Sequence, residues 1–483
     1  MGRRNGHRFV AILGVLLVGS VYTGCPTSGG GDSGSPTEIG VYYEPSTEAE
    51  PEIGIVTGRY YYRMEEDPVQ YFDDFYRLGL HWIRIEFEDF WDHRPGGGTA
   101  TTYENAIVTE KIEVYRSIIE EAHKRHIKVL GVLGVNSMPG GLFFEDGVLT
   151  QNTIDRYVGA VEWHLETYDV DAVEIWNEPW GFGFGSPNRP ELLKGYAQLL
   201  IESYTSVKPD HPDVLFVAPV TANAEQGEWL GHHGWETATY RFAPEESIFN
   251  NSLMQDYRNA NGGELPLDVI SWHPYGTGGD PAGNFYFGRT FETYYRTIIG
   301  EIPLAVPGAP GGQIVFEDIA GRSIVGDYPV WFTEWGWQSG TPDQEETHAD
   351  YITSMVRTMR DYPQIEVAML YTYQDDEDTA DSEGYRYGIR TDSDRSDGKF
   401  RRKEAYFELL GHATRVGLDT DGTIDREFVD VFVQNGGRYK LGLPTSPIQD
   451  APDGTRYQIL RDGVDGPAEL VRPLGESVRV RYD

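Results

Sequence analysis

Two glutamates of this 483-residue sequence stand where apolar runs end. Glu178 belongs to VEIWNEPW, residues 173–180. Glu334 belongs to VWFTEWGW, residues 330–337. If the fold brings two such carboxyl groups together, one of them, with a raised pKa, can protonate a leaving group, while the other attacks as an ionised nucleophile. The two motifs therefore predict an acid/base group at Glu178 and a nucleophile at Glu334.

The elements around these motifs alternate between apolar runs and amphipathic stretches. The first helix, for example, is expected to begin at Asp67–Pro68 and to end at Gly79, since these residue types suit its two ends. Eight alternations of this kind predict a parallel sheet that closes into a (β/α)8 barrel, an α/β fold. The predicted strands are 53–60, 82–87, 127–135, 172–176, 214–220, 269–273, 330–335 and 367–373.

The predicted barrel gives the two glutamates a common location. Catalytic residues of such barrels lie at the C-terminal ends of the strands, and Glu178 and Glu334 end the fourth and seventh predicted strands. Their side chains can then face each other across the mouth of the barrel. Retaining hydrolysis of a glycosidic bond needs two carboxyl groups roughly 5–5.5 Å apart. The absence of a Gly-x-Gly-x-x-Gly motif after the first predicted strand disfavours a dinucleotide-binding fold.

The motifs Trp-Asn-Glu-Pro and Thr-Glu-Trp-Gly resemble those of clan A of the retaining glycoside hydrolases, with families 5 and 39 nearest. The resemblance covers about residues 53–413. It implies that Asn177 binds the 2-hydroxyl of the sugar and that Arg84 steadies the ionised Glu334. It also implies that His273 and Tyr275, in SWHPYG, lie in the active site, with Tyr275 donating to Glu334.

Two strand ends depart from the family pattern. Family 5 members often carry histidine after strand three, where Asn136 is nearest here, and the eighth strand ends in Tyr371-Thr-Tyr373, where many relatives place tryptophan. Asn136 and Tyr373 are therefore also expected to bind substrate. Sugar rings stack on aromatic faces, so the tryptophans beside the motifs are further candidates for substrate binding, with core packing as the alternative: Trp180, Trp335 and Trp337.

The amino-acid composition limits the classes of molecule that the protein is expected to bind. The net charge is −37 and the sequence pI is about 4.6, which disfavours nucleic acid as a partner. The expected partner is a polysaccharide or oligosaccharide. The acidic clusters at 375–378 and 419–425 are more typical of solvated turns than of a calcium site. The retaining mechanism needs no cofactor or metal, so none is expected.

The N-terminus predicts export. Residues 1–25 have a basic start, an apolar core too short for a membrane span, and small residues before Cys25. They resemble a bacterial lipoprotein signal, in which Cys25 is lipidated; cleavage by an ordinary signal peptidase is the alternative. Residues 26–50 are expected to form a flexible linker. A secreted enzyme held on a bacterial membrane only by this lipid, facing the periplasm or the cell surface, is the predicted arrangement.

The C-terminal part predicts a second unit. After the catalytic barrel, expected over 51–415, residues 420–483 change character and resemble small modules of bacterial cell-surface proteins. Capping of the barrel and docking to a glycan are equally compatible with that segment. For the barrel, the sequence favours an endo-β-glycanase over an exo-β-xylosidase. A transglycosylase with the same residues and a non-catalytic glycan-binding surface lipoprotein are the alternatives.

Overall fold

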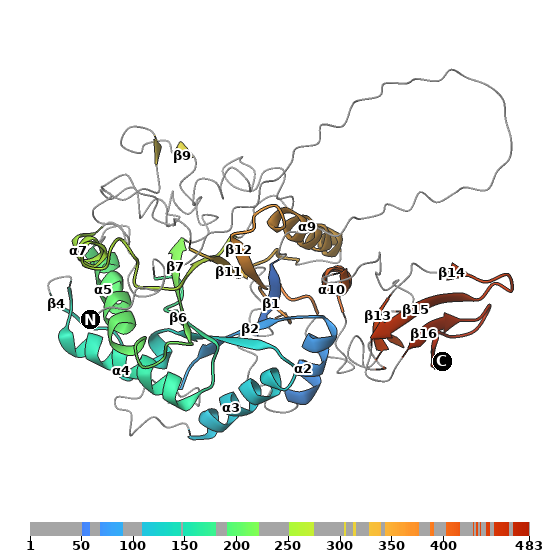
Figure 1. Ribbon diagram of the computed structural model, residues 1–483, viewed down its shortest axis with the longest axis horizontal. Helices are drawn as coiled ribbons and strands as arrows, with labels where there is room; N and C mark the ends of the chain where they lie inside the picture. The colour runs from blue at the N-terminus through green and yellow to red at the C-terminus, as the bar shows by residue number, and fades with distance from the viewer. Residues whose placement is uncertain are drawn as a thin grey trace, which may run out of the picture. The chain divides into compact units, whose positions relative to one another are not determined.

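The computed structural model of the protein (Figure 1) defines where the predicted elements lie. The residues that it describes, and to which every structural statement below applies, are 51–57, 68–89, 109–145, 148–179, 191–221, 251–274, 304–305, 313–314, 328–339, 343–375, 387–390, 402–415, 428, 431–432, 435, 441–444, 449–462 and 467–482.

Eight parallel strands close into a barrel, in the order β1-β12-β11-β8-β7-β6-β3-β2. Every neighbouring pair is parallel, which confirms the predicted (β/α)8 fold. The buried strands are rich in valine, isoleucine and leucine, as expected where both faces of a sheet are covered. They are β1 (Glu52–Val56), β2 (Trp82–Phe87), β3 (Lys128–Leu133), β6 (Ala172–Ile175), β7 (Leu215–Thr221), β8 (Val269–Trp272), β11 (Val330–Trp335) and β12 (Ile365–Leu370).

Helices surround these strands (Figure 1). Helix α4 begins where the Thr150 side chain accepts a hydrogen bond from the Thr153 amide, which satisfies one of the free N–H groups of its first turn. The alternation of elements in the sequence also predicts a helix over 290–300, which lies outside the described residues. The helices are α2 (Pro68–Arg77), α3 (Thr109–His123), α4 (Gln151–Thr167), α5 (Glu191–Val207), α7 (Ser252–Ala260), α9 (Asp343–Met359) and α10 (Glu404–Arg415).

The inside of the barrel changes from apolar to polar along the strands. A buried cluster that includes Ala172 and Val269, the first residues of β6 and β8, fills the part nearer the strand starts, where the Trp82 and Trp331 rings pack 4.6 Å apart between centroids. Two residues after Trp82 on the same strand comes Arg84, and two after Trp331 comes Thr333. Because alternate strand residues share a face, these polar side chains form the next layer, toward the C-terminal ends.

Tyr373 closes the barrel instead of binding substrate. Its ring is buried against Phe75 of α2, 4.8 Å between centroids, and its hydroxyl donates to Asp74. The Tyr406 hydroxyl of α10 donates to the same carboxylate at 2.7 Å. Burial and the nearby carboxylate raise the pKa of both phenols well above the usual value, so both remain donors. The substrate-binding role predicted for Tyr373 is therefore wrong, because its ring and hydroxyl are engaged between helices.

Replacing Asp74 with alanine should destabilise the fold by about 3 kcal/mol, because the change leaves the buried Tyr406 hydroxyl without this acceptor and removes one partner of Tyr373. Urea unfolding followed by fluorescence measures the loss. Asp74→Asn keeps one acceptor oxygen and should cost less. Equal stability of wild type and Asp74→Ala would contradict a stabilising hydrogen bond between α2 and α10 at Asp74.

Antiparallel strands near the C-terminus form a separate sheet, in the order β13-β15-β16-β17, with β14 paired to β15. The sequence segments RYQIL (456–460) and ELVRP (469–473) overlap two of them. The bounds are β13 (Gly442–Pro444), β14 (Gln449–Asp450), β15 (Arg456–Asp462), β16 (Ala468–Arg472) and β17 (Arg479–Tyr482).

Two short strand pairs and one 3₁₀ turn complete the described elements. A hairpin of β4 (Phe144–Glu145) and β5 (Val148–Leu149) follows the 3₁₀ turn η3 (Val135–Ser137), and β9 (Leu304–Ala305) pairs with β10 (Gln313–Ile314). None of the described helices has the length and apolarity that a bilayer crossing requires. The predicted signal segment, Cys25 and the linker lie outside the described residues.

Candidate active site

The chain after β6 turns two polar side chains toward the barrel axis. Trp176 and Glu178 have φ values of 72° and 42°, a region that side chains other than glycine seldom occupy and that costs energy. The Trp176 ring packs outward on Tyr157 of α4, 5.7 Å between centroids. Asn177 and Glu178 instead bond to residues of other strands. The unusual backbone thus breaks the strand alternation where the WNEP motif begins.

An irregular strand pairing also breaks the alternation of side chains on β11. Phe332 pairs with Ala368 and Trp335 with Leu370 of β12, with a register shift between the two pairs. Phe332 and Trp335 both belong to the core cluster that includes the helices. Thr333 and Glu334 lie between them, and both bond to groups inside the barrel. A bulge re-aims side chains in this way, which places Glu334 at the site.

Trp335 does not fit its predicted role. The residue is fully buried, and its ring lies 6.2 Å from Tyr351 of α9 between centroids. No face of the ring is open to a sugar, so its assignment as a substrate-binding residue is wrong and the core-packing alternative holds. Trp337 is half-buried with its ring 5.6 Å from Tyr351, and its contact with substrate stays a prediction.

Arg84 connects three acidic or amide side chains from two strands. Its guanidinium donates from Nε to Glu174 at 2.7 Å, from Nη1 to Glu334 at 2.6 Å and from Nη2 to Asn177 at 2.8 Å. Arg84, Glu174 and Glu334 are all buried. The planar fork of arginine suits such simultaneous contacts. Arg84 therefore fixes the position of Glu334 and also balances the negative charge of the buried Glu174.

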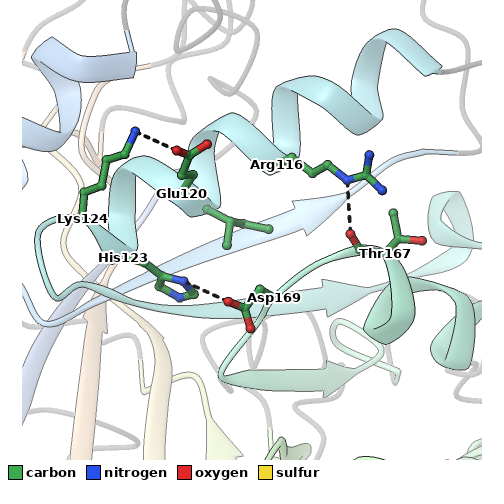
Figure 2. Close-up of a pocket in the computed structure, with 7 residues that line it drawn as sticks. Arg116, Glu120, His123, Lys124, Thr167 and Asp169 are labelled. Atoms are coloured by element: carbon green, nitrogen blue, oxygen red, sulfur yellow. Dashed lines mark hydrogen bonds and ion pairs between the residues drawn. The ribbon is translucent and has the colours of Figure 1, made fainter.

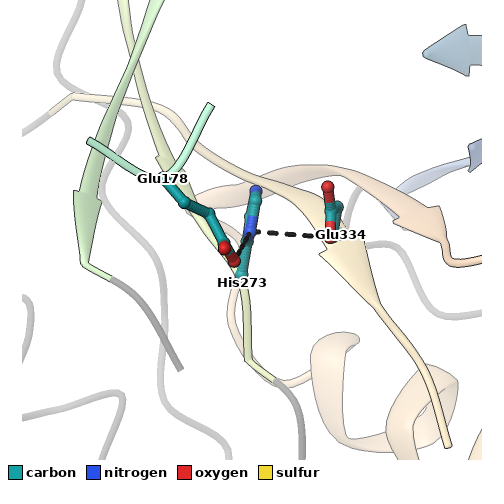
Figure 3. A group of neighbouring side chains, drawn as sticks. All are labelled: Glu178, His273 and Glu334. Atoms are coloured by element: carbon teal, nitrogen blue, oxygen red, sulfur yellow. Dashed lines mark hydrogen bonds and ion pairs between the residues drawn. The ribbon is translucent and has the colours of Figure 1, made fainter. Parts of the chain in front are cut away.

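His273, directly after β8, lies between the two glutamates (Figure 3). Its Nδ1 is 2.9 Å from Oε1 of Glu178 and 3.7 Å from Oε2 of Glu334. Its Nε2 is 3.0 Å from the Thr333 hydroxyl. One ligand-type atom of each residue, Glu178, His273 and Glu334, lies within 4.8 Å of the other two. The strand ends thus bring both predicted carboxyl groups into one cluster.

The electrostatics of the two glutamates differ. Burial alone would lower the pKa of Arg84, but the charges of Glu174 and Glu334 outweigh it and raise that pKa. Arg84 therefore stays charged against Glu334. Burial would also lower the pKa of His273, but Glu334 and the hydrogen bond with Glu178 raise it despite the opposing charge of Arg84. Glu334 faces a permanent cation, whereas Glu178 faces a group that can give or take a proton.

The same three residues are the one group among the described residues compact enough to hold a metal ion. The donor set argues against that use. The Arg84 guanidinium donates to Glu334 at 2.6 Å, so a metal cation there would meet a fixed positive charge. The described geometry suits a proton shared within a hydrogen-bonded cluster better than a divalent ion.

The structure brings together five of the predicted site residues, and their roles stay predictions: Arg84, Asn177, Glu178, His273 and Glu334. Asn136 lies after β3, half-buried, and donates to Glu88 at 3.2 Å; its contact with substrate stays a prediction. Tyr275 and Trp180 lie outside the described residues.

Three residues of the cluster had not been predicted: Glu174, Ser271 and Thr333. Ser271 and Thr333 both donate to Oε1 of Glu174, at 2.7 and 2.9 Å. A signal existed in the sequence, because each of them is a polar residue inside an otherwise apolar strand run. Buried polar groups need hydrogen-bond partners, so a search for polar residues within those runs would have found all three.

A surface cavity of about 510 Å³ lies elsewhere, between the ends of α3 and α4 (Figure 2). Its charged side chains pair with one another: Lys124 with Glu120 at 2.9 Å and His123 with Asp169 at 3.6 Å. These residues precede the N-terminal ends of β3 and β6. That end of the barrel is opposite to the strand tips that carry Glu178 and Glu334, so the cavity is separate from the candidate active site.

No protein-family model matches the sequence, and no curated protein matches it. Among solved structures the chain is similar to a family 39 glycoside hydrolase from the gut symbiont Bacteroides cellulosilyticus WH2, at 16% identity over 88% of this chain and 71% of that one, with a TM-score of 0.44. It is also similar to a β-glucosidase from Exiguobacterium marinum, at 14% identity over 74% and 88%, with a TM-score of 0.46.

A family 1 β-glucosidase from Thermotoga maritima gives 13% identity over 72% of this chain and 86% of that one, with a TM-score of 0.43. Identities and scores this low decide nothing about substrate or catalytic residues, so the function of this chain has to follow from its side chains.

Proposed function

We propose that the protein is a retaining glycoside hydrolase that cleaves β-glycosidic bonds, with Glu178 as acid/base and Glu334 as nucleophile. One observation carries the proposal: carboxylate oxygens of Glu178 and Glu334 lie within 4.8 Å of each other at the tips of the fourth and seventh barrel strands. The spacing is that of retaining enzymes, since inverting enzymes hold the two carboxyl groups roughly 6.5–9.5 Å apart.

The unequal surroundings of the two glutamates support these roles. Arg84, donating to Glu334 at 2.6 Å, stabilises the ionised form that a nucleophile needs. Among the described residues, Glu178 pairs with His273 through a 2.9 Å hydrogen bond rather than with an arginine or lysine, which suits a group that gains and loses a proton in each cycle. Two carboxyl groups in contrasting environments are typical of acid and nucleophile pairs.

The first step forms a covalent intermediate. Glu178 gives its proton to the glycosidic oxygen as the bond to the anomeric carbon breaks, and a Glu334 oxygen bonds to that carbon. The leaving sugar departs with the proton. Asn177, held by Arg84 at 2.8 Å, is placed beside Glu178 to bind the 2-hydroxyl, where a hydrogen bond strengthens in the transition state.

The second step releases the sugar with retention. Glu178, now ionised, takes a proton from water, and the resulting hydroxyl attacks the anomeric carbon from the side that the leaving group vacated. The bond to Glu334 breaks and its carboxylate returns to Arg84. An acceptor sugar in place of water would give transglycosylation with the same residues, so the products decide between the two outcomes.

The substrate proposed is a polysaccharide or oligosaccharide, with endo-β-glycanase action favoured over exo-β-xylosidase action. The enzyme is proposed to be exported and held on a bacterial membrane through lipidated Cys25, with residues 26–50 as a tether and 420–483 as an accessory module. The surviving aromatic candidates for sugar contact are Trp180, Tyr275 and Trp337. A glycan-binding protein without activity is the alternative, and turnover separates it from an enzyme.

Purified protein incubated with a panel of β-glucans, mannans, xylans and aryl β-glycosides should release reducing sugar from at least one of them. Proton NMR during the first minutes should show the β-anomer forming before mutarotation, because two inversions at one carbon give net retention. An α-anomer as first product would contradict the double displacement. No turnover on the whole panel would favour the binding protein.

A further inference from the structure

A network of buried, hydrogen-bonded side chains contacts Glu178 through His273. Its four members are Glu174, Ser271, Thr333 and His273. Glu174 is fully buried, and its Oε1 accepts from the hydroxyls of Ser271 and Thr333 at 2.7 and 2.9 Å. Its Oε2 accepts from Arg84 at 2.7 Å. The carboxylate of Glu174 therefore fixes the direction in which each hydroxyl donates, because an ionised carboxylate only accepts.

That direction determines the role of the Thr333 oxygen toward His273. A hydroxyl has one proton to donate, and Thr333 gives it to Glu174. The Thr333 oxygen lies 3.0 Å from Nε2 of His273, so at this contact it can only accept. Nε2 must then carry a hydrogen, which leaves Nδ1, 2.9 Å from Oε1 of Glu178, as the nitrogen that binds or releases a proton.

We propose that Thr333 is a positioning residue that fixes a proton on Nε2 of His273, so that His273 and Glu178 share one proton through Nδ1. The inference rests on the proposed function in taking Glu178 as the acid/base. The shared proton moves between Nδ1 and Oε1 of Glu178 without net change. The glycosidic oxygen takes it in the first step, and the attacking water restores it in the second.

The charged groups around His273 favour retention of that proton. Glu178 and Glu334 face Nδ1 at 2.9 and 3.7 Å, Glu174 acts through Thr333, and Arg84 opposes them. Burial lowers the pKa of His273, yet the carboxylates raise it overall. In a coupled pair the proton belongs to both members, so the pair rather than either residue should set the alkaline limit of activity.

The test compares Thr333→Val with Thr333→Ser. Valine removes the acceptor for Nε2–H, which weakens the doubly protonated imidazole and lets the pair lose its proton at lower pH. The alkaline limb of the kcat/KM profile should therefore move down by about one pH unit, the scale expected for one buried hydrogen bond to a charged group. Serine keeps the hydroxyl and should keep the limb in place.

Ser271→Ala is the matched control. It removes the other hydroxyl from the same Glu174 oxygen, but the described hydrogen bond of the Ser271 side chain is to Glu174 and not to His273, so the alkaline limb should stay at its wild-type pH. A structural effect on the barrel would move the limb in both variants or lower kcat in both alike. An alkaline limb at the same pH in Thr333→Val and Thr333→Ser would overturn the inference.

Nitrogen-15 NMR of histidine-labelled protein gives a readout that needs no turnover. In the wild type, Nε2 of His273 should stay protonated across the pH range while Nδ1 titrates. A neutral form with the proton on Nδ1 would overturn the inference even if the enzyme is active. If the substrate panel gives no turnover but the Nε2–H form is observed, the proposed function fails and the role of Thr333 in fixing the tautomer stands.

Discussion

Glu334→Ala should lower kcat/KM by roughly 10⁴-fold or more, the order of magnitude that loss of a covalent nucleophile costs. In the proposed mechanism, removal of the carboxylate leaves the anomeric carbon without an attacking group, while Asn177, held by Arg84, can still bind the sugar. Added azide should restore turnover of an aryl β-glycoside, since a small anion fits where the carboxylate was. The product should be the α-glycosyl azide, because a single displacement inverts the carbon.

Glu178→Ala is the matched control for that experiment. Loss of a general acid should cost about 10²–10⁴-fold on substrates with poor leaving groups, and much less on aryl glycosides whose leaving group departs unprotonated. Azide should then attack the glycosyl-enzyme and give the β-glycosyl azide. Opposite product anomers from the two variants identify acid/base and nucleophile. The same anomer from both, or full activity in either, would contradict the assignment.

The barrel could be predicted closely because its strands are buried on both sides. Such strands read as continuous apolar runs, and the runs at 82–87 and 330–335 match β2 and β11 residue for residue. Agreement is poorer at the ends of elements: the strand predicted over 127–135 spans only Lys128–Leu133. The domain boundaries and the export signal stay predictions, since the described residues begin at 51.

The residues brought to the site were predictable where a motif marks them, and less so where the backbone departs from regular geometry. Alternation along β11 would place Thr333 and Trp335 on one face, but the register shift against β12 sends Trp335 to the core and Glu334 to the barrel interior. No local pattern in the sequence VWFTEWGW predicts that register shift. The motif therefore predicted Glu334 as a site residue, and the structure places it beside Arg84, whereas the position of Trp335 near a strand end suggested substrate contact for a ring that lies in the core.

The substrate-binding role predicted for Tyr373 was wrong because a contact distant in sequence decides where its side chain lies. Its nearness to a strand end suggested the barrel mouth, but its hydroxyl donates to Asp74, which lies 299 positions away. Such a contact depends on how the first helix meets the last strand, and single-residue properties do not encode it. Glu174 shows the opposite case, because a glutamate in a fully buried strand already implies a partner of opposite charge.

Arg84→Met should destabilise the protein by about 3–5 kcal/mol, the cost of removing one partner from a buried ion pair. Glu174 and Glu334 would remain buried with no cation between them, since Arg84 donates to both, at 2.7 and 2.6 Å. Urea unfolding at pH 7 measures the loss. Arg116→Met, the same substitution at an exposed pair 3.1 Å from Glu113, should cost about 1 kcal/mol or less.

The double variant Arg84→Met with Glu174→Gln separates charge from packing. If uncompensated charge dominates, neutralising Glu174 should restore part of the stability lost in Arg84→Met, so the two changes should be less than additive. If lost packing dominates, the two costs should add. Arg84→Lys should fall between wild type and Arg84→Met, because an ammonium keeps the charge but cannot reproduce the planar fork. A fully additive cycle would mean that Arg84 holds the barrel interior by shape, and the ionised state of Glu334 would then need another cause.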